Sequence, residues 1–438
     1  AYAEAMTYSG DSRTALEKIA PEARRLAEDL GDRARAIAAC QQAFGALSAT
    51  GAVPIYGTPE AGAWVEAGER YAEPDSAAMV HLHVAKAYRF GITGQPEESR
   101  DEIRKARALS RKVGDPALLW HADAAAATAL NRPADAAEAL ELNLELLHRS
   151  PEGAALGVLG QVYTMSAGQF LVLGRIRESE EARERLAELA MRTRSPHLQL
   201  LSLFTKATVL ISQGRFSEFM EIDEQIRSAT TEGQREFANM WRQGTLALAR
   251  IYFGEYGDNS PPPGFLQPIV NIPEVLSSDT ATASARLDQL ISMMGQRGIE
   301  EWPPIPMSVL ALGAVRIGHL AGCRLVQQYY NGYGLRTNGG IFGPQCIPRV
   351  LGDCARILGE PAKAREQYAE ALTVCEEMGL RPEKALAALG LAEVLLEHYP
   401  EERDAAIEHL DFAIAELTEM KMQPALERAL RHRGLLKA

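Results

Sequence analysis

The chain has 438 residues and a formal net charge of −12, with 46% hydrophobic and 24% charged residues. These fractions are those of a folded protein, and the acidic balance argues against direct binding to nucleic acid, whose phosphates it repels. Five irregularly spaced cysteines argue against a disulfide scaffold and favour a reducing cytoplasm. We find no signal peptide and no apolar stretch long enough to span a bilayer, so we expect a cytoplasmic protein without membrane contact.

Helical periodicity starts near the beginning of the chain. We expect helices over Ala15–Leu30, Arg33–Ser48 and Ala61–Tyr71, with a loop over Thr50–Pro59. The first residues already resemble a helix, and the chain begins at Ala1. We therefore expect it to be part of a longer or processed protein.

Two distant segments share one order of residue types. Each starts at a turn glycine, Gly94 or Gly359, with a small residue at +5, Arg at +6, a large apolar residue at +9, a small residue at +12 and Gly at +20. Asn131, Gly174 and Gly214 occupy the same place elsewhere. A small residue stands seven positions before each of the five turns, where it allows close helix approach: Ala87, Ala124, Ala167, Ala207 and Gly352. The pattern predicts helical hairpins with a glycine stop.

This pattern resembles the tetratricopeptide repeat (TPR) family and is clearest from Leu351 to Leu372. From residue 94 to residue 214 the turns are 37, 43 and 40 residues apart, against 34 in a regular repeat. The resemblance implies an all-α fold, an α-solenoid in which about ten divergent TPR-like hairpins form an open right-handed superhelix.

Two interruptions divide the predicted array. Prolines and glycines over 254–273 predict an irregular segment between an N-terminal array, 1–253, and a C-terminal array, 274–438. A glycine-rich loop over 329–348 carries four aromatic residues. It either binds a ligand or partner or is an ordinary spacer. Those aromatics are Tyr329, Tyr330, Tyr333 and Phe342.

The C-terminal array contains further expected helices. We predict one buried helix over Met307–Cys323, a hairpin of Glu383–His398 and Glu402–Met420, and a terminal helix over Pro424–Leu436.

Known catalytic and metal motifs are absent from the sequence. It holds no P-loop, HExxH, GxSxG or CxxC, so we expect no cofactor, no metal and no catalysis. His81 and His83 fall on different faces of a helix, and Cys346 and Cys354 are interpreted as packing residues. Glutamate pairs such as Glu97–Glu98 suit the first turns of helices.

In a helical-hairpin array the first helix of each hairpin lines the concave groove. Under this frame the predicted groove residues are His81, Tyr88, His121, Gln161, Thr164, Arg349, Asp353 and Arg356. We expect a protein or peptide partner there, or a small-molecule inducer.

The stretch from Gly340 to Arg433, including 351–382 and 413–430, resembles the TPR tail of large bacterial regulators. These join a cyclase or DNA-binding output domain to a signal-transduction ATPase and a sensor tail. The resemblance implies a sensor role for this chain. The alternatives are a stand-alone scaffold or adaptor that uses the same groove, and an all-α enzyme with an acidic cleft.

Overall fold

The computed structural model describes residues 14–49, 53–231, 234–253, 279–296, 298–302, 304–338 and 343–435. Within these ranges every regular element is a helix, apart from an isolated bridge between Thr337 and Cys346. The predicted all-α class is confirmed. The predicted irregular segment 254–273 lies outside the described residues.

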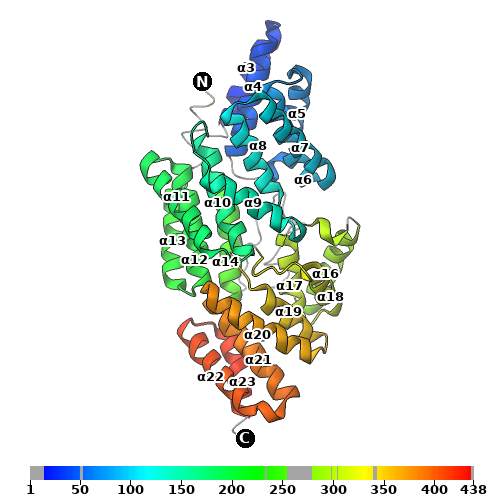
Figure 1. Ribbon diagram of the computed structural model, residues 1–438, viewed down its shortest axis with the longest axis vertical. Helices are drawn as coiled ribbons and strands as arrows, with labels where there is room; N and C mark the ends of the chain where they lie inside the picture. The colour runs from blue at the N-terminus through cyan, green and yellow to red at the C-terminus, as the bar shows by residue number, and fades with distance from the viewer. Residues whose placement is uncertain are drawn as a thin grey trace.

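The first part of the chain runs from the top of Figure 1 through its blue, cyan and green helices. Its elements are η1 (Ala15–Ile19), α3 (Ala20–Asp29), α4 (Arg33–Ala49), η2 (Val53–Gly57), α5 (Pro59–Tyr71), α6 (Ala77–Thr93), α7 (Pro96–Val113), α8 (Pro116–Ala129), η3 (Pro133–Asp135), α9 (Ala136–His148), α10 (Leu156–Val172), α11 (Ile176–Thr193), α12 (Pro196–Ser212), α13 (Phe216–Ala229) and α14 (Arg235–Phe253).

The second part forms the yellow, orange and red helices and ends at the bottom of Figure 1. Its elements are α16 (Thr280–Gly295), η5 (Ile299–Glu301), α17 (Pro304–Ile317), α18 (Leu320–Tyr330), α19 (Ile347–Ile357), α20 (Pro361–Met378), α21 (Arg381–His398), η6 (Pro400–Glu402), α22 (Arg403–Glu419) and α23 (Gln423–Leu435).

Consecutive helices pack against each other as pairs, for example α6 with α7, α10 with α11, α19 with α20 and α21 with α22. A second set of contacts joins every other helix, so that α4, α6, α8, α10, α12 and α14 each touch the next in that series. The same holds for α17, α19, α21 and α23. We call these two series the inner helices.

The predicted turn glycines have the backbone conformation that requires glycine. Gly94, Gly174, Gly214 and Gly359 have φ between 71° and 81°, a left-handed region that other residues enter at a cost. Asn131 is not among the positive-φ residues; there the short helix η3 leads into α9 instead.

Two of the small residues before these turns, Ala87 and Ala167, accept a hydrogen bond from the second helix of their hairpin. The Ser99 hydroxyl donates to the Ala87 carbonyl at 2.8 Å, and Ser179 makes the same bond to Ala167 at 2.7 Å. Both serines stand five residues after the turn glycine. A side chain larger than alanine at position 87 or 167 would separate the paired helices and break this bond.

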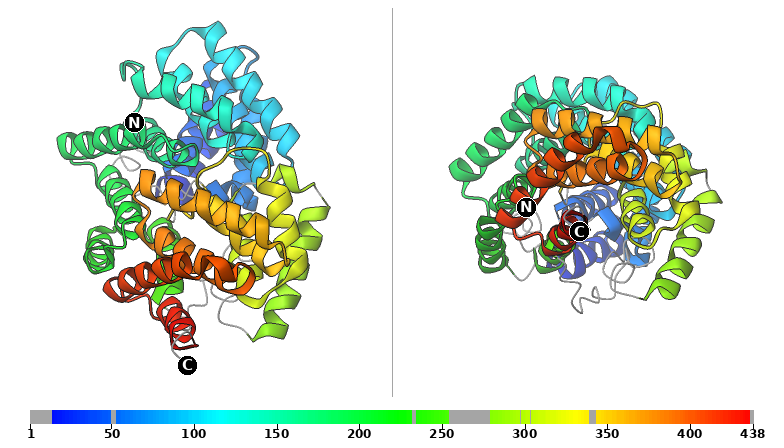
Figure 2. Two further views of the ribbon diagram at one scale, coloured as in Figure 1. Left: turned by 60° about the horizontal axis from the view of Figure 1, so that its bottom comes forward. Right: turned by 90° about the horizontal axis from the view of Figure 1, so that it is seen from below.

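The second part of the chain returns to the first. Helix α21 contacts α12, and α23 contacts α14. Both views in Figure 2 show the orange and red helices beside the green ones. One apolar cluster runs from Phe44 through Phe204 and Trp241 to Leu389 and Leu417, so it joins the first helices to α21 and α22, whereas α16–α19 and α20 pack mainly in two clusters of their own. These contacts bring helices that are far apart in the sequence side by side, and they do not confirm the predicted open superhelix.

Two predicted elements have different bounds in the structure. Tyr329 and Tyr330 are the last residues of α18, and α19 begins at Ile347, so the predicted loop 329–348 is shorter at both ends. The predicted single helix over Met307–Cys323 is divided at Gly318, whose φ is 68°, into α17 and α18. Among the described helices, none is long and apolar enough to cross a membrane.

Candidate functional site

Four of the predicted groove residues come together on three inner helices. His81 and Tyr88 belong to α6, His121 to α8 and Gln161 to α10. They face one another because each inner helix packs on the next. The fifth predicted residue of this part, Thr164, is buried and donates to the Gly160 carbonyl of its own helix at 2.7 Å, so its hydroxyl is occupied within α10.

A hydrogen-bonded bridge joins these three helices. The Gln161 amide nitrogen donates to the Tyr88 hydroxyl at 3.1 Å and to the Thr128 hydroxyl at 3.0 Å. Tyr88 also packs on the Tyr56 ring, with centroids 5.1 Å apart. Sequence reasoning missed Thr128, although it lies seven residues after His121 on the same helical face.

His81 and His121 form a second contact between α6 and α8, with ring centroids 4.6 Å apart. Burial lowers the pKa of His81, an effect that the Asp115 carboxylate opposes. Burial lowers the pKa of His121 to about 3, helped by repulsion from His81. Both rings are therefore neutral at pH 7. In each ring, one nitrogen is a hydrogen-bond donor and the other is an acceptor.

The predicted groove residues Arg349 and Asp353 lie in the core. They are 7% and 6% exposed, and they pair with each other along α19. Arg349 also donates to Glu383 at 2.7 Å, and that carboxylate accepts from the Tyr252 hydroxyl at 2.9 Å. Attraction to Glu383 and Asp353 outweighs burial and raises the pKa of Arg349. These groups are satisfied within the chain, so their visible role is to hold α14, α19 and α21 together.

Arg356 differs from these two residues because part of its side chain reaches the surface. Its Nε lies 3.7 Å from Glu393 of α21, a carboxylate only 4% exposed. Arg428 and His432 of α23 approach the same carboxylate at 2.8 and 3.1 Å. Arg428 Nε makes its ion pair without hydrogen-bond geometry, and the buried atoms Arg356 Nε and Glu393 Oε2 also lack a hydrogen bond in the described structure. Two arginines and one histidine of α19 and α23 thus surround a single carboxylate of α21.

The sequence carries a signal for the buried carboxylates of α21. Glu383 lies in its first turn and Glu393 is the single charged residue over 385–396, and both are at most 3% exposed as whole residues. A carboxylate on the buried face of a helix requires a partner. Sequence alone does not say which arginine supplies it.

The described part of the predicted loop is hydrogen-bonded to the end of α10. Arg336 N–H donates to the Val172 carbonyl at 2.7 Å, and the Thr337 hydroxyl donates to the Leu171 carbonyl at 2.9 Å. Tyr329 and Tyr330 are buried, whereas Tyr333 is 40% exposed. Phe342 lies outside the described residues. This segment therefore attaches to the end of α10, and of its described aromatics Tyr333 is the one open to a ligand.

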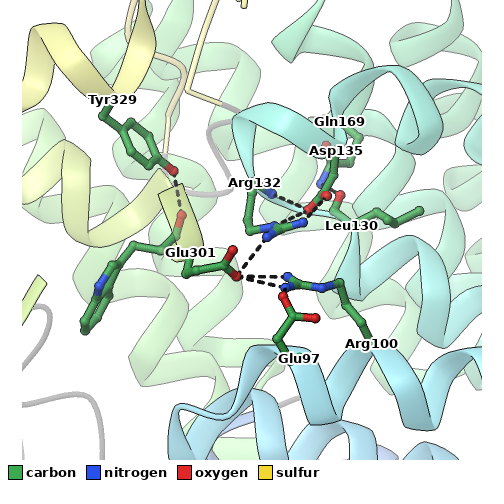
Figure 3. A network of polar contacts seen from close by, with 9 residues as sticks. Glu97, Arg100, Leu130, Arg132, Asp135, Gln169, Glu301 and Tyr329 are labelled. Carbon is green, nitrogen blue, oxygen red and sulfur yellow. Dashed lines mark hydrogen bonds and ion pairs between the residues drawn. The ribbon is translucent and has the colours of Figure 1, made fainter. Parts of the chain in front are cut away.

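A further cluster, shown in Figure 3, escaped sequence reasoning. The Glu301 carboxylate accepts from Arg100 at 3.0 Å and from Arg132 at 2.8 Å, and Arg132 also binds Asp135. Beside it the Tyr329 hydroxyl donates to the Trp302 carbonyl at 2.7 Å. These contacts join η5 to α7 and η3. No local sequence pattern predicts them, because the residues are far apart in the chain.

The carboxylates of α7 are relevant to the alternative that the chain is an enzyme with an acidic cleft. A shallow hollow of about 470 Å³ is lined by Phe90, Glu97, Glu98, Asp101, Glu102, Arg104 and Lys105. Burial would raise the pKa of Glu102, but hydrogen bonds from His83 and Lys105 and the charge of Lys86 lower it to about 2. This carboxylate is ionised at neutral pH and cannot donate a proton as a general acid.

No cluster of three or more potential metal ligands occurs among the residues that the structure describes. No protein-family model matches the chain. No curated protein matches it either, so the geometry of its helices is the basis for any assignment.

Proposed function

We propose that the chain is a non-catalytic interaction or sensor module, built as a TPR-like α-solenoid. Its inner helices bind a protein or peptide partner, or a small-molecule inducer. The observation that carries the proposal is the series of contacts from α4 through α14, in which each inner helix touches the next. Stacked hairpins of this kind present one extended surface, which suits recognition of an elongated ligand.

Two groups of side chains on this surface supply the recognition chemistry. The first is the neutral, aromatic and amide set of His81, His121 and Gln161 on α6, α8 and α10, in which the buried Tyr88 serves as a hydrogen-bond partner of Gln161. The second is the basic set of Arg356, Arg428 and His432 on α19 and α23. The first suits apolar and hydrogen-bonding groups, and the second suits a carboxylate or phosphate.

The regulatory part of the proposal rests on the resemblance of residues 340–433 to the sensor tail of bacterial signal-transduction regulators. We further infer a cytoplasmic location, in keeping with that resemblance. Under the alternative reading, a stand-alone adaptor would use the same inner surface, and its partner would not be a regulatory output domain.

The test is native mass spectrometry of the chain purified from its own source. A protein or small molecule that co-purifies is then titrated against the wild type and two inner-surface variants, Gln161→Ala and Arg356→Ala. The matched control is Arg192→Ala on α11, whose side chain is 74% exposed.

We expect at least one inner-surface variant to weaken binding about tenfold, a loss of about 1.4 kcal/mol, while the control binds like the wild type. Equal binding by all four proteins would show that the ligand binds elsewhere. The identity of the co-purifying molecule separates a sensor from an adaptor.

A further inference from the structure

A cluster of arginines surrounds the buried side chain of Asp123 on α8. Arg107 of α7 donates through Nε to one Asp123 oxygen at 2.8 Å, and Arg149, which ends α9, donates through Nη2 to the other oxygen at 2.7 Å. A third guanidinium, that of Arg111 on α7, lies 4.0 Å from the first oxygen. The Asp123 side chain is 5% exposed, so one enclosed carboxylate meets three arginines.

Two of these arginines are held in a fixed orientation. The Arg149 guanidinium lies over the Trp120 ring, 5.1 Å from its centroid, and the Trp120 indole N–H donates to the Ser150 carbonyl at 3.3 Å. The bond to Asp123 restrains Arg107. Guanidinium groups that are already ordered lose little conformational entropy when they bind an anion.

The cluster contains more hydrogen-bond donors than acceptors. Within the described structure both Nη atoms of Arg107 lack a hydrogen bond, and because neither is buried they reach solvent. Arg149 Nη1 is buried and unpaired. The Arg111 side chain is 58% exposed, and its guanidinium makes no hydrogen bond to another described residue. On the exposed side of the cluster, guanidinium nitrogens are therefore available to an oxyanion.

The charges around Asp123 do not cancel. The second carboxylate of the cluster is that of Glu145, which is 61% exposed and pairs with Arg149 at 2.5 Å. Three guanidinium groups against two carboxylates leave one positive charge, in a chain whose formal net charge is −12. This local excess of positive charge favours an anion at this position.

We propose that Arg107, Arg111 and Arg149 bind the phosphate group of a small molecule, with Asp123 as the anchor that orients Arg107 and Arg149. A phosphate group carries about two negative charges near neutral pH and at least three acceptor oxygens, so it can accept from several guanidinium groups at once. Asp123 follows His121 by two positions and thus lies about 200° around α8, on the opposite face from the proposed inner surface. The inference is therefore independent of the proposed function.

The experiment titrates the full chain with inorganic phosphate and with glycerol phosphate by isothermal titration calorimetry, at a constant ionic strength set with chloride. We expect binding that Arg111→Gln weakens about tenfold, because the variant loses one charged group of donors. Arg111→Lys keeps the charge but loses the planar arrangement of donors, and its Kd should lie between those of Arg111→Gln and the wild type. The matched control is Arg192→Gln on α11, at an arginine 74% exposed that pairs with Glu188 one turn away, and it should bind like the wild type.

The exposure of Arg111 protects the test against misfolding, and equal melting temperatures without phosphate check that both Arg111 variants fold. Tighter binding of the ester identifies a phosphorylated small molecule as the ligand, and equal or tighter binding of inorganic phosphate identifies the free anion; either result supports the site. The inference is overturned if neither compound binds at millimolar concentration, or if Arg111→Gln binds like the wild type. It is equally overturned if Arg192→Gln loses as much affinity as Arg111→Gln, because phosphate would then respond to the general surface charge.

Discussion

Arg132 donates a 2.8 Å hydrogen bond to Glu301 across 169 positions of sequence. Arg100 binds the same carboxylate oxygen, so one glutamate side chain joins two elements of the first array to the start of the second. The Glu301 side chain is 22% exposed, a position in which charge-assisted hydrogen bonds keep part of their strength.

Glu301→Gln should therefore lower the free energy of unfolding by about 1 kcal/mol, because the amide keeps the shape but loses the charge that two arginines share. Urea unfolding measures the change. The control is Glu97→Gln, whose side chain also pairs with Arg100 but is 72% exposed, and it should change stability by less than about 0.5 kcal/mol. Equal effects in the two variants would show that the contact between the arrays contributes nothing of its own.

Glu383 anchors the buried network of α14, α19 and α21. It accepts from Arg349, from the Tyr252 hydroxyl and from the Cys346 backbone N–H. Glu383→Gln should destabilise the protein by about 1.5–3 kcal/mol, because the amide loses the charge that strengthens the hydrogen bonds from Arg349 and from the Cys346 backbone N–H, while Asp353 remains paired with Arg349.

Chemical denaturation of Glu383→Gln is compared with that of Lys112→Gln, which removes the exposed ion pair between Lys112 and Asp75. The surface variant should lose less than about 1 kcal/mol. A loss of the same size in both would mean that the buried network does not hold the three helices together.

Tyr368 fills the space beside two glycines. A Cβ atom on Gly390 would lie 2.3 Å from Tyr368 Cζ, and one on Gly352 would lie 2.8 Å from its Cδ1. Gly390→Ala should therefore cost about 1–3 kcal/mol, because the fully buried Tyr368 ring has to move.

Gly45→Ala is the matched control, since Gly45 lies in α4 with nothing within 4 Å of its added Cβ. That change should stabilise the protein by about 0.5–1 kcal/mol through helix propensity. Thermal melts of both variants test the close contact of α19, α20 and α21, and a neutral Gly390→Ala would contradict it.

His121 predicts how stability depends on pH. Its pKa falls from the ordinary histidine value of 6.5 in the unfolded chain to about 3 in the fold, because burial disfavours the charged ring, so below pH 6.5 the unfolded state binds a proton that the folded state does not. Stability contributed by the neutral ring is complete above pH 6.5 and decreases as the pH falls toward 3, by up to about 1.4 kcal/mol per unit.

Urea unfolding at pH 7.5 and pH 5 measures this loss in the wild type and in His121→Gln. The variant should lose less stability than the wild type over this interval. His148→Gln, at a side chain 58% exposed, should follow the wild type. If His121→Gln loses as much stability as the wild type between pH 7.5 and pH 5, protonation of His121 does not destabilise the folded state.

Local features were predictable from the sequence because they depend on neighbours in the chain. Left-handed turns favour glycine at 94, 174, 214 and 359, and after the first two of them a serine five residues later bonds to the small residue of the preceding helix. Helical periodicity and the absence of strand alternation likewise predicted the all-α class. Each of these follows from backbone conformation and side-chain size within one hairpin.

The positions of the predicted site residues were decided by tertiary structure. Periodicity placed Arg349 and Asp353 on an exposed face, but Glu383 and Tyr252 arrive from distant helices and enclose them. Tyr329 and Tyr330 extend α18 because Trp302 and the surrounding apolar side chains bury their rings.

The sequence by itself determined the helices, their pairing and their glycine stops, since these depend on residues within one or two turns of each other. The return of α21 and α23 to α12 and α14, the Glu301 contact and the burial of Arg349 by Glu383 were decided by the tertiary structure. The physical reason is that a long-range contact depends on the summed packing angles of every intervening hairpin, and no local pattern of residues records that sum.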